Sequence, residues 1–169
     1  MTTQSPAPPL GNRKENGRLP NPVARRVRTV VVERVSDVPG GSLPARATEG
    51  SACFDLAAAE AADLVRGTVT LVRTGIRVRC PPGTFLEVRP RSGLSSRGVL
   101  MVNAPGTIDR DYSGEVRVPL TYLFDGPYRV EAGDRIGQVR LVEDLPGRFR
   151  AGKVQPRRSR SGGFGSTGR

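Results

Sequence analysis

The residues best able to do chemistry in this chain are carboxylates, because the sequence contains no histidine. In the segment NAPGTIDRDYSGE, at 103–115, Asp109 follows a Pro-Gly turn and Tyr112 comes three residues later. A carboxylate held near such a turn could act as a general base that activates water. Asp109 and Asp111 could equally be ordinary turn residues, since Asp side chains stabilise turns. This segment alone leaves both interpretations open.

The segment RPRSGLSSRG, at 89–98, carries groups that bind anions. Arg91 presents a fork of N–H donors that suits a phosphate. Ser92 and Gly93 stand at the expected start of a short helix, where free amides and the helix dipole favour an anion. The alternative interpretation is a capped turn with a surface arginine.

Polar side chains also interrupt two strand-like segments. Asp55 lies in the apolar segment GSACFDL, so it either has a structural partner or faces a cation site. Asp134 and Gln138 lie in the segment GDRIGQ, where a Gly-Asp turn enters a strand. Asp134 could simply stabilise this turn, and Gln138 could be an ordinary exposed strand residue.

The net charge of +11 is concentrated in the two ends of the chain. Residues 1–28 hold six Arg or Lys and one Glu, and residues 145–169 hold seven Arg or Lys and no acid, whereas 29–144 are almost neutral. Such ends could bind polyanions, nucleic acid included, or could be solvated, disordered tails. The glycine-rich segment GGFGSTG, near the end, could wrap its amides around phosphate while Phe164 stacks on a flat ring; a flexible tail is the alternative.

Composition excludes several classes of protein. The two cysteines, Cys53 and Cys80, lack CxxC spacing, and without histidine a usual zinc site or a His-based triad is not expected. No apolar run approaches the length of a membrane span, and the N-terminus lacks the apolar region of a secretory signal. Two unpaired thiols and no export signal predict a cytoplasmic protein with no membrane partner.

Short strands must position these residues. Strand-like segments follow one another closely, with Gly or Pro in nearly every gap, which predicts an all-β sandwich or barrel. The clearest alternation places Val116, Val118, Leu120 and Tyr122 on one face of a strand. A short helix is expected near 92–97. The predicted strands are 27–32, 52–58, 68–73, 75–80, 84–89, 98–103, 114–123, 128–131 and 135–142.

Five segments of the sequence, taken in order, resemble the motifs of the homotrimeric deoxyuridine triphosphatase (dUTPase) family. They are GSACFDLAAAE, RPRSGLSSRG, NAPGTIDRDYSGE, GDRIGQVRL and GGFGSTG. The resemblance covers about 28–169 and implies a jelly-roll or β-clip barrel at 28–147. It says nothing of residues 1–27, whose composition predicts a disordered basic extension. It implies a flexible arm with a glycine-rich lid at 148–169.

The resemblance implies a reaction in which Asp109 deprotonates a water that attacks the α-phosphorus of dUTP, so that dUMP and pyrophosphate are released. Tyr112 matches the ring beneath the deoxyribose, which leaves no room for a 2′-hydroxyl. The hairpin that reads uracil and excludes thymine matches Asn103, Gly106, Thr107, Ile108 and Arg117. Such an enzyme supplies the dTMP precursor and keeps uracil out of DNA.

The resemblance also implies how the triphosphate is bound. Asp55 matches the carboxylate that holds Mg²⁺ through water, and either Arg158 or Arg160 is expected at the γ-phosphate. Phosphate contacts match Arg91, Ser92, Gly93 and Gln138 in the body, and Phe164, Gly165, Ser166 and Thr167 in the lid over uracil and phosphate. Two positions depart from the family pattern: Cys53 replaces a glycine, and Ser159 replaces an arginine. The family further implies a homotrimer whose active sites are shared between subunits.

Two other functions remain as alternatives. The related dCTP deaminases share the fold, but their catalytic glutamate would fall at Pro119, and no acid occurs between Glu115 and Asp125. A non-catalytic nucleic-acid-binding or regulatory protein could use the basic ends. The body, however, has few aromatic residues and no excess of basic residues for such binding.

Overall fold

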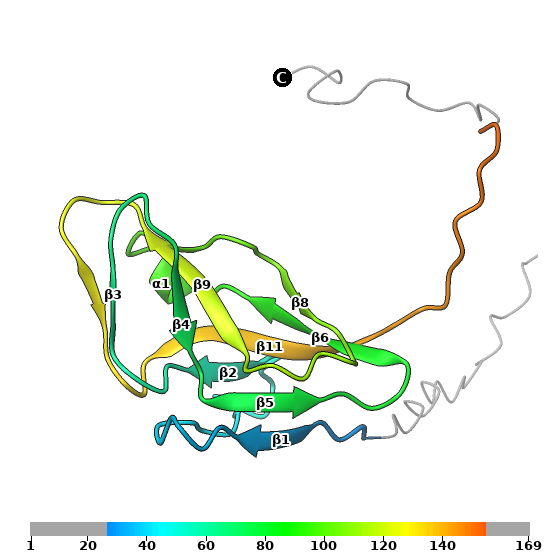
Figure 1. Cartoon of the computed structure of the whole chain (residues 1–169), viewed down its shortest axis with the longest axis horizontal. Helices are drawn as coiled ribbons and strands as arrows, with labels where there is room; N and C mark the ends of the chain where they lie inside the picture. Colours follow the sequence, from blue (N-terminus) through cyan, green and yellow to red (C-terminus); the bar gives the residue numbers. More distant parts are fainter. Residues whose placement is uncertain (1–26, 155–169) are drawn as a thin grey trace, which may run out of the picture.

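The computed structural model describes residues 27–154, which form short antiparallel strands and one helical turn (Figure 1). The fifth motif, with Arg158, Arg160, Phe164, Gly165, Ser166 and Thr167, lies outside the described residues, as does nearly all of the predicted extension 1–27. The elements are β1 (Val31–Arg34), β2 (Phe54–Ala57), β3 (Ala62–Leu64), β4 (Thr70–Arg73), β5 (Ile76–Arg79), β6 (Thr84–Arg89), α1 (Ser92–Ser95), β7 (Val99–Met101), β8 (Gly106–Ile108), β9 (Arg117–Tyr122), β10 (Tyr128–Val130) and β11 (Arg135–Glu143).

The strands pair mainly with partners that are distant in the sequence. The largest sheet has the order β2-β11-β6-β8, and a second sheet has the order β4-β9-β7. Two ribbons, β1-β5 and β10-β3, complete the body (Figure 1). Because early strand β2 lies beside late strand β11, the chain closes on itself, as expected of a jelly roll. The all-β prediction with one short helix is confirmed.

The alternating strands bury one face each. In β9, Val118 and Leu120 are almost fully buried, whereas Arg117, the first residue of the strand, is exposed. Ile76 and Val78 of β5 follow the same rule. These side chains belong to one apolar core, and the burial of such aliphatic side chains is the main stabilising term of a domain this size. The alternation predicted for 116–122 is therefore confirmed.

The strand boundaries differ from those predicted where pairing with another strand, rather than the local sequence, determines them. The first strand was expected from Val27 but begins at Val31, where pairing with Arg79 of β5 begins. Strand β3 was not predicted, because Ala62–Leu64 has little β-propensity; it forms by pairing with β10. After β11 ends at Glu143, residues 144–154 carry no helix or strand and lead away from the body (Figure 1). In the part of the chain that the structure describes, no helix is long and apolar enough to cross a membrane.

Candidate active site

The first, second and fourth motifs meet at one pocket. In the main sheet, Gln138 of β11 pairs with Asp55 of β2 on one side and with Arg89 of β6 on the other. This register brings together three segments whose paired residues are as much as 83 positions apart in the sequence. The pocket has a volume of about 290 Å³ and is lined by Ala47, Ser51, Ala52, Cys53, Asp55, Arg91, Ser92, Gly93 and Gln138.

The carboxylate of Asp55 is paired with two arginines. Its Oδ1 lies 2.9 Å from Nε of Arg91, and its Oδ2 lies 3.3 Å from a terminal nitrogen of Arg135. The Asp55 side chain is only 18% exposed, so these ion pairs offset much of the cost of its burial. Arg135 also belongs to GDRIGQ but was not among the predicted site residues. Its position three residues before Gln138, at the start of a strand, was the available signal.

The remaining groups of the pocket suit an anion. The helical turn α1 begins at Ser92, and the first amides of a helix have no partner within it, so those of Ser92 and Gly93 can donate to a ligand. Gln138 Nε2 donates to the carbonyl of Pro90 at 2.8 Å, which ties β11 to the loop before α1. Arg91 in the lining and Arg135, which pairs with Asp55 from outside the lining, outnumber the one carboxylate, and this local charge favours phosphate. Cys53 lies half-buried in its wall.

The candidate general base lies elsewhere. Asp109 directly follows β8, at the opposite edge of the sheet from β2, and its side chain is exposed. Three strand spacings and a stagger of four residues in register separate it from Asp55. With standard strand dimensions this is roughly 19 Å. The structure therefore does not bring all the predicted site residues of one chain together.

Tyr112 lies in the turn of the segment 103–116, which runs through β8 and then turns back towards β9. We call this segment the hairpin, although β8 and β9 pair with strands of two different sheets and not with each other. Its hydroxyl donates to the carbonyl of Glu115 at 3.0 Å, and its amide donates to the carbonyl of Asp109 at 3.2 Å. Tyr112 is 45% exposed and borders a second cavity, of about 580 Å³, together with Arg77 and Arg79 of β5 and Arg110. Asn103 packs against Gly106 at the base of this hairpin, while Thr107 is exposed and Ile108 is half-buried.

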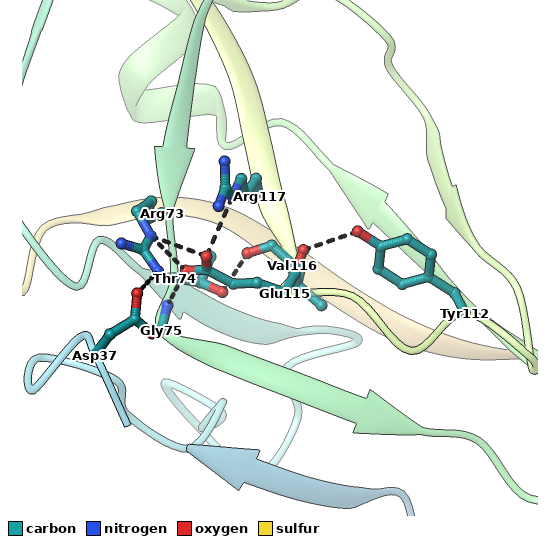
Figure 2. Close-up of polar contacts among 8 residues, drawn as sticks. All are labelled: Asp37, Arg73, Thr74, Gly75, Tyr112, Glu115, Val116 and Arg117. Atoms are coloured by element: carbon teal, nitrogen blue, oxygen red, sulfur yellow. Dashed lines mark hydrogen bonds and ion pairs between the residues drawn. The ribbon is translucent and has the colours of Figure 1, made fainter. Parts of the chain in front are cut away.

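Arg117, expected on the strand that returns from the hairpin, binds a buried carboxylate. Its Nε donates to Oε2 of Glu115 at 3.1 Å, and Arg73 donates to the same carboxylate (Figure 2). Arg73 also bonds Asp37, which lowers the pKa of Asp37; the bonds to Asp37 and Glu115 raise the pKa of Arg73. Glu115 was not predicted to be a site residue. The signal was its place directly after Gly114, where an acid precedes an apolar strand.

The described residues offer no metal-binding cage made of protein groups alone. Within residues 27–154, no three His, Cys, Asp or Glu side chains gather as ligands. Mg²⁺ usually keeps several waters and binds through one or two carboxylates together with substrate phosphates. Asp55, in a pocket whose other groups suit an anion, fits the role of a carboxylate that binds Mg²⁺ together with water and substrate phosphates.

Gly114 should be intolerant of any side chain, because the Tyr112 ring covers it. A Cβ at position 114 would lie 2.6 Å from Cζ of Tyr112, which is less than a carbon–carbon contact allows. We expect Gly114→Ala to push the exposed ring aside and to lower kcat/KM by up to about a hundredfold, since a misplacement of an ångström can cost that much. Gly147→Ala, where a Cβ would meet open space and the backbone is not left-handed, controls for the general cost of such a change. Wild-type kcat/KM in Gly114→Ala would contradict this prediction.

The chain is similar to known dUTPases in sequence and in fold. The dUTPase family matches residues 40–168, a range that contains all five motifs. The deoxyuridine 5'-triphosphate nucleotidohydrolase of Anaeromyxobacter sp. (strain Fw109-5) is 46% identical over 153 residues, covering 83% of this chain and 98% of that protein. The protein of the same name from Brucella melitensis biotype 2 (strain ATCC 23457) is 42% identical, covering 83% of this chain and 93% of its own.

A solved structure shares the fold. The mutant dUTPase of phage phi11 of S. aureus superimposes with a TM-score of 0.67 and 20% sequence identity. The match covers 75% of this chain and 97% of that one. That structure describes the coordination of a structural Mg(II) ion. At this identity the similarity concerns the fold alone.

Proposed function

Since the chain belongs to the dUTPase family, we infer that it is a dUTP diphosphatase, which hydrolyses dUTP to dUMP and pyrophosphate. The observation that carries this conclusion is the family match over residues 40–168, with all five motifs in order. The reaction yields the precursor of dTMP and removes the nucleotide that would place uracil in DNA.

Asp109 acts as the general base. Its carboxylate is exposed and makes no ion pair within residues 27–154, so it can hold a water and accept its proton. The water oxygen then bonds to the α-phosphorus, the bond from that phosphorus to the bridging oxygen breaks, and pyrophosphate leaves. Tyr112 supports the deoxyribose from below, and the hairpin with Asn103, Gly106, Thr107, Ile108 and Arg117 encloses uracil.

The triphosphate lies in the pocket of Arg91, Ser92, Gly93 and Gln138. The amides and the guanidinium there stabilise charge on the departing pyrophosphate. Asp55 would hold Mg²⁺ through water, and the ion would supply further neutralisation of the phosphates. The fifth motif completes the enclosure: Phe164 covers the base, Gly165, Ser166 and Thr167 wrap the phosphates, and Arg158 or Arg160 reaches the γ-phosphate.

The active site is shared between copies of the chain in a homotrimer. The water held by Asp109 must reach a phosphorus whose neighbouring phosphates contact Ser92 and Gly93, so these groups must lie within a few ångströms of one nucleotide. Within one chain Asp109 lies roughly 19 Å from Asp55, which lines the same pocket as Ser92 and Gly93. This separation supports a site that takes Asp109 from one copy and the phosphate pocket from another. A heterologous, ring-closing interface is the kind of assembly that builds such sites.

Pyrophosphate release tests the function directly. We expect dUTP to be preferred over dTTP, dCTP and UTP by about a hundredfold or more. The methyl group of dTTP and the 2′-hydroxyl of UTP collide with a tight hairpin and a ring, and the amino group of dCTP donates where the uracil carbonyl accepts. Rates are compared for the four nucleotides with and without Mg²⁺, and ammonia is measured in parallel. Release of ammonia from dCTP at a comparable rate would contradict the proposed activity.

A further inference from the structure

We propose that Glu115 is a positioning residue of the active site, whose buried carboxylate clamps the end of the catalytic hairpin and thereby holds the Tyr112 ring in place. This inference rests on the proposed function, in which that ring supports the deoxyribose. It goes beyond it by assigning a task to a residue that does not touch the nucleotide.

The carboxylate of Glu115 accepts hydrogen bonds from three residues, two of them at the turn between β4 and β5 (Figure 2). Its side chain is only 6% exposed. Gly75 donates its amide to Oε1 at 2.9 Å, Arg73 donates Nε to Oε2 at 2.9 Å and to Oε1 at 3.2 Å, and Arg117 donates Nε to Oε2 at 3.1 Å. Moving a buried carboxylate away from this many charged and amide donors is costly, because it would leave the carboxylate charge and the guanidiniums without their partners.

The same contacts attach the end of the hairpin to the turn between β4 and β5. The amide of Val116 donates to the carbonyl of Ile76 at 2.9 Å, and Thr74 Oγ1 donates to the carbonyl of Val116 at 2.5 Å. The turn is itself fixed from the other side, since the carbonyl of Gly75 accepts the amide of Val35 at 2.8 Å. Glu115 therefore joins the end of the hairpin to a part of the body that is held on both sides.

The position of Tyr112 follows from that of Glu115. The Tyr112 hydroxyl donates to the main-chain carbonyl of Glu115, the residue whose side chain is clamped. The ring lies over Gly114, and with 45% of the residue exposed it has little other packing to hold it. The hydrogen bond to the Glu115 carbonyl and the contact with Gly114 thus fix the position of the Tyr112 ring. The position of the Glu115 carbonyl is fixed in turn by the bonds of the Glu115 carboxylate.

The variant Glu115→Gln tests this role. Glutamine keeps the shape and one acceptor for Gly75, but it turns an amide donor toward the guanidiniums of Arg73 and Arg117. We expect the ratio of kcat/KM for dUTP to kcat/KM for UTP to fall by about tenfold, because a displaced ring no longer excludes the 2′-hydroxyl. A merely structural role would reduce the amount of folded protein, which lowers both rates equally and leaves the ratio unchanged.

Two further variants make the result decisive. Asp63→Asn removes another arginine–carboxylate pair, in which Arg129 lies 3.1 Å from Asp63 on β3 and β10, and it should leave the ratio at the wild-type value. Tyr112→Phe removes only the hydroxyl and should lower the ratio in the same direction as Glu115→Gln. If Glu115→Gln does not fold, the ratio of Tyr112→Phe decides the question.

The outcomes separate the two proposals. An unchanged ratio in folded Glu115→Gln, or in Tyr112→Phe where the first variant does not fold, would overturn the positioning role. Wild-type protein that shows no preference for dUTP over UTP would instead overturn the proposed function.

Discussion

Turnover of dUTP should fall by about 10²–10⁴ when Asp109 is replaced by Asn, while nucleotide binding stays near the wild-type level. Asparagine has almost the same shape as aspartate, so the hairpin and its contacts persist. What is lost is the negative charge and the basicity needed to take a proton from water. Because the sequence has no histidine, no neighbouring imidazole can replace the lost base.

Two measurements separate chemistry from binding in Asp109→Asn. Steady-state kinetics gives kcat, and calorimetric titration with a non-hydrolysable dUTP analogue gives the dissociation constant. Asp111→Asn, two residues along the same hairpin and equally exposed, is the matched comparison and should retain most of the turnover. A larger loss of turnover in Asp111→Asn than in Asp109→Asn would mean that Asp111, and not Asp109, is the general base.

Activity should reappear when two nearly inactive variants are assembled together. Asp109→Asn lacks the base, and Arg91→Ala lacks the guanidinium of the phosphate pocket. In a homotrimer with shared sites, each mixed trimer has one interface of three that joins an intact base to an intact pocket, so the mixed assemblies should regain roughly a third of wild-type activity. This is a large gain over either parent, since each parent carries the same defect at every site.

The mixed assembly is prepared by co-expression of the two variants with different affinity tags and purified over both tags. Light scattering gives the mass of the assembly, and pyrophosphate release gives its activity. Two tagged copies of Asp109→Asn, carried through the same procedure, should stay inactive. Doubly tagged oligomers of both variants without any regained activity would mean that each chain carries a complete site.

Much of the local structure follows from short patterns in the sequence. The alternation from Val116 to Tyr122 predicts β9 and its buried face, and the serine- and glycine-containing segment near Ser92 predicts the helical turn α1. These features depend on neighbours within a few residues, and side-chain period and turn chemistry describe such neighbours well. The motif order is likewise a property of the chain alone, and it was sufficient to indicate the family.

Other features depend on which strands become neighbours. Asp55 and Gln138 meet only because β2 pairs with β11, and β3 exists only because β10 lies beside it. Asp109 is separated from the phosphate pocket because β8 forms the opposite edge of that sheet. The burial of Glu115 requires Arg73 and Gly75, some 40 residues away. Pairing over such distances is decided by packing of the whole core, whereas sequence patterns report only local preference.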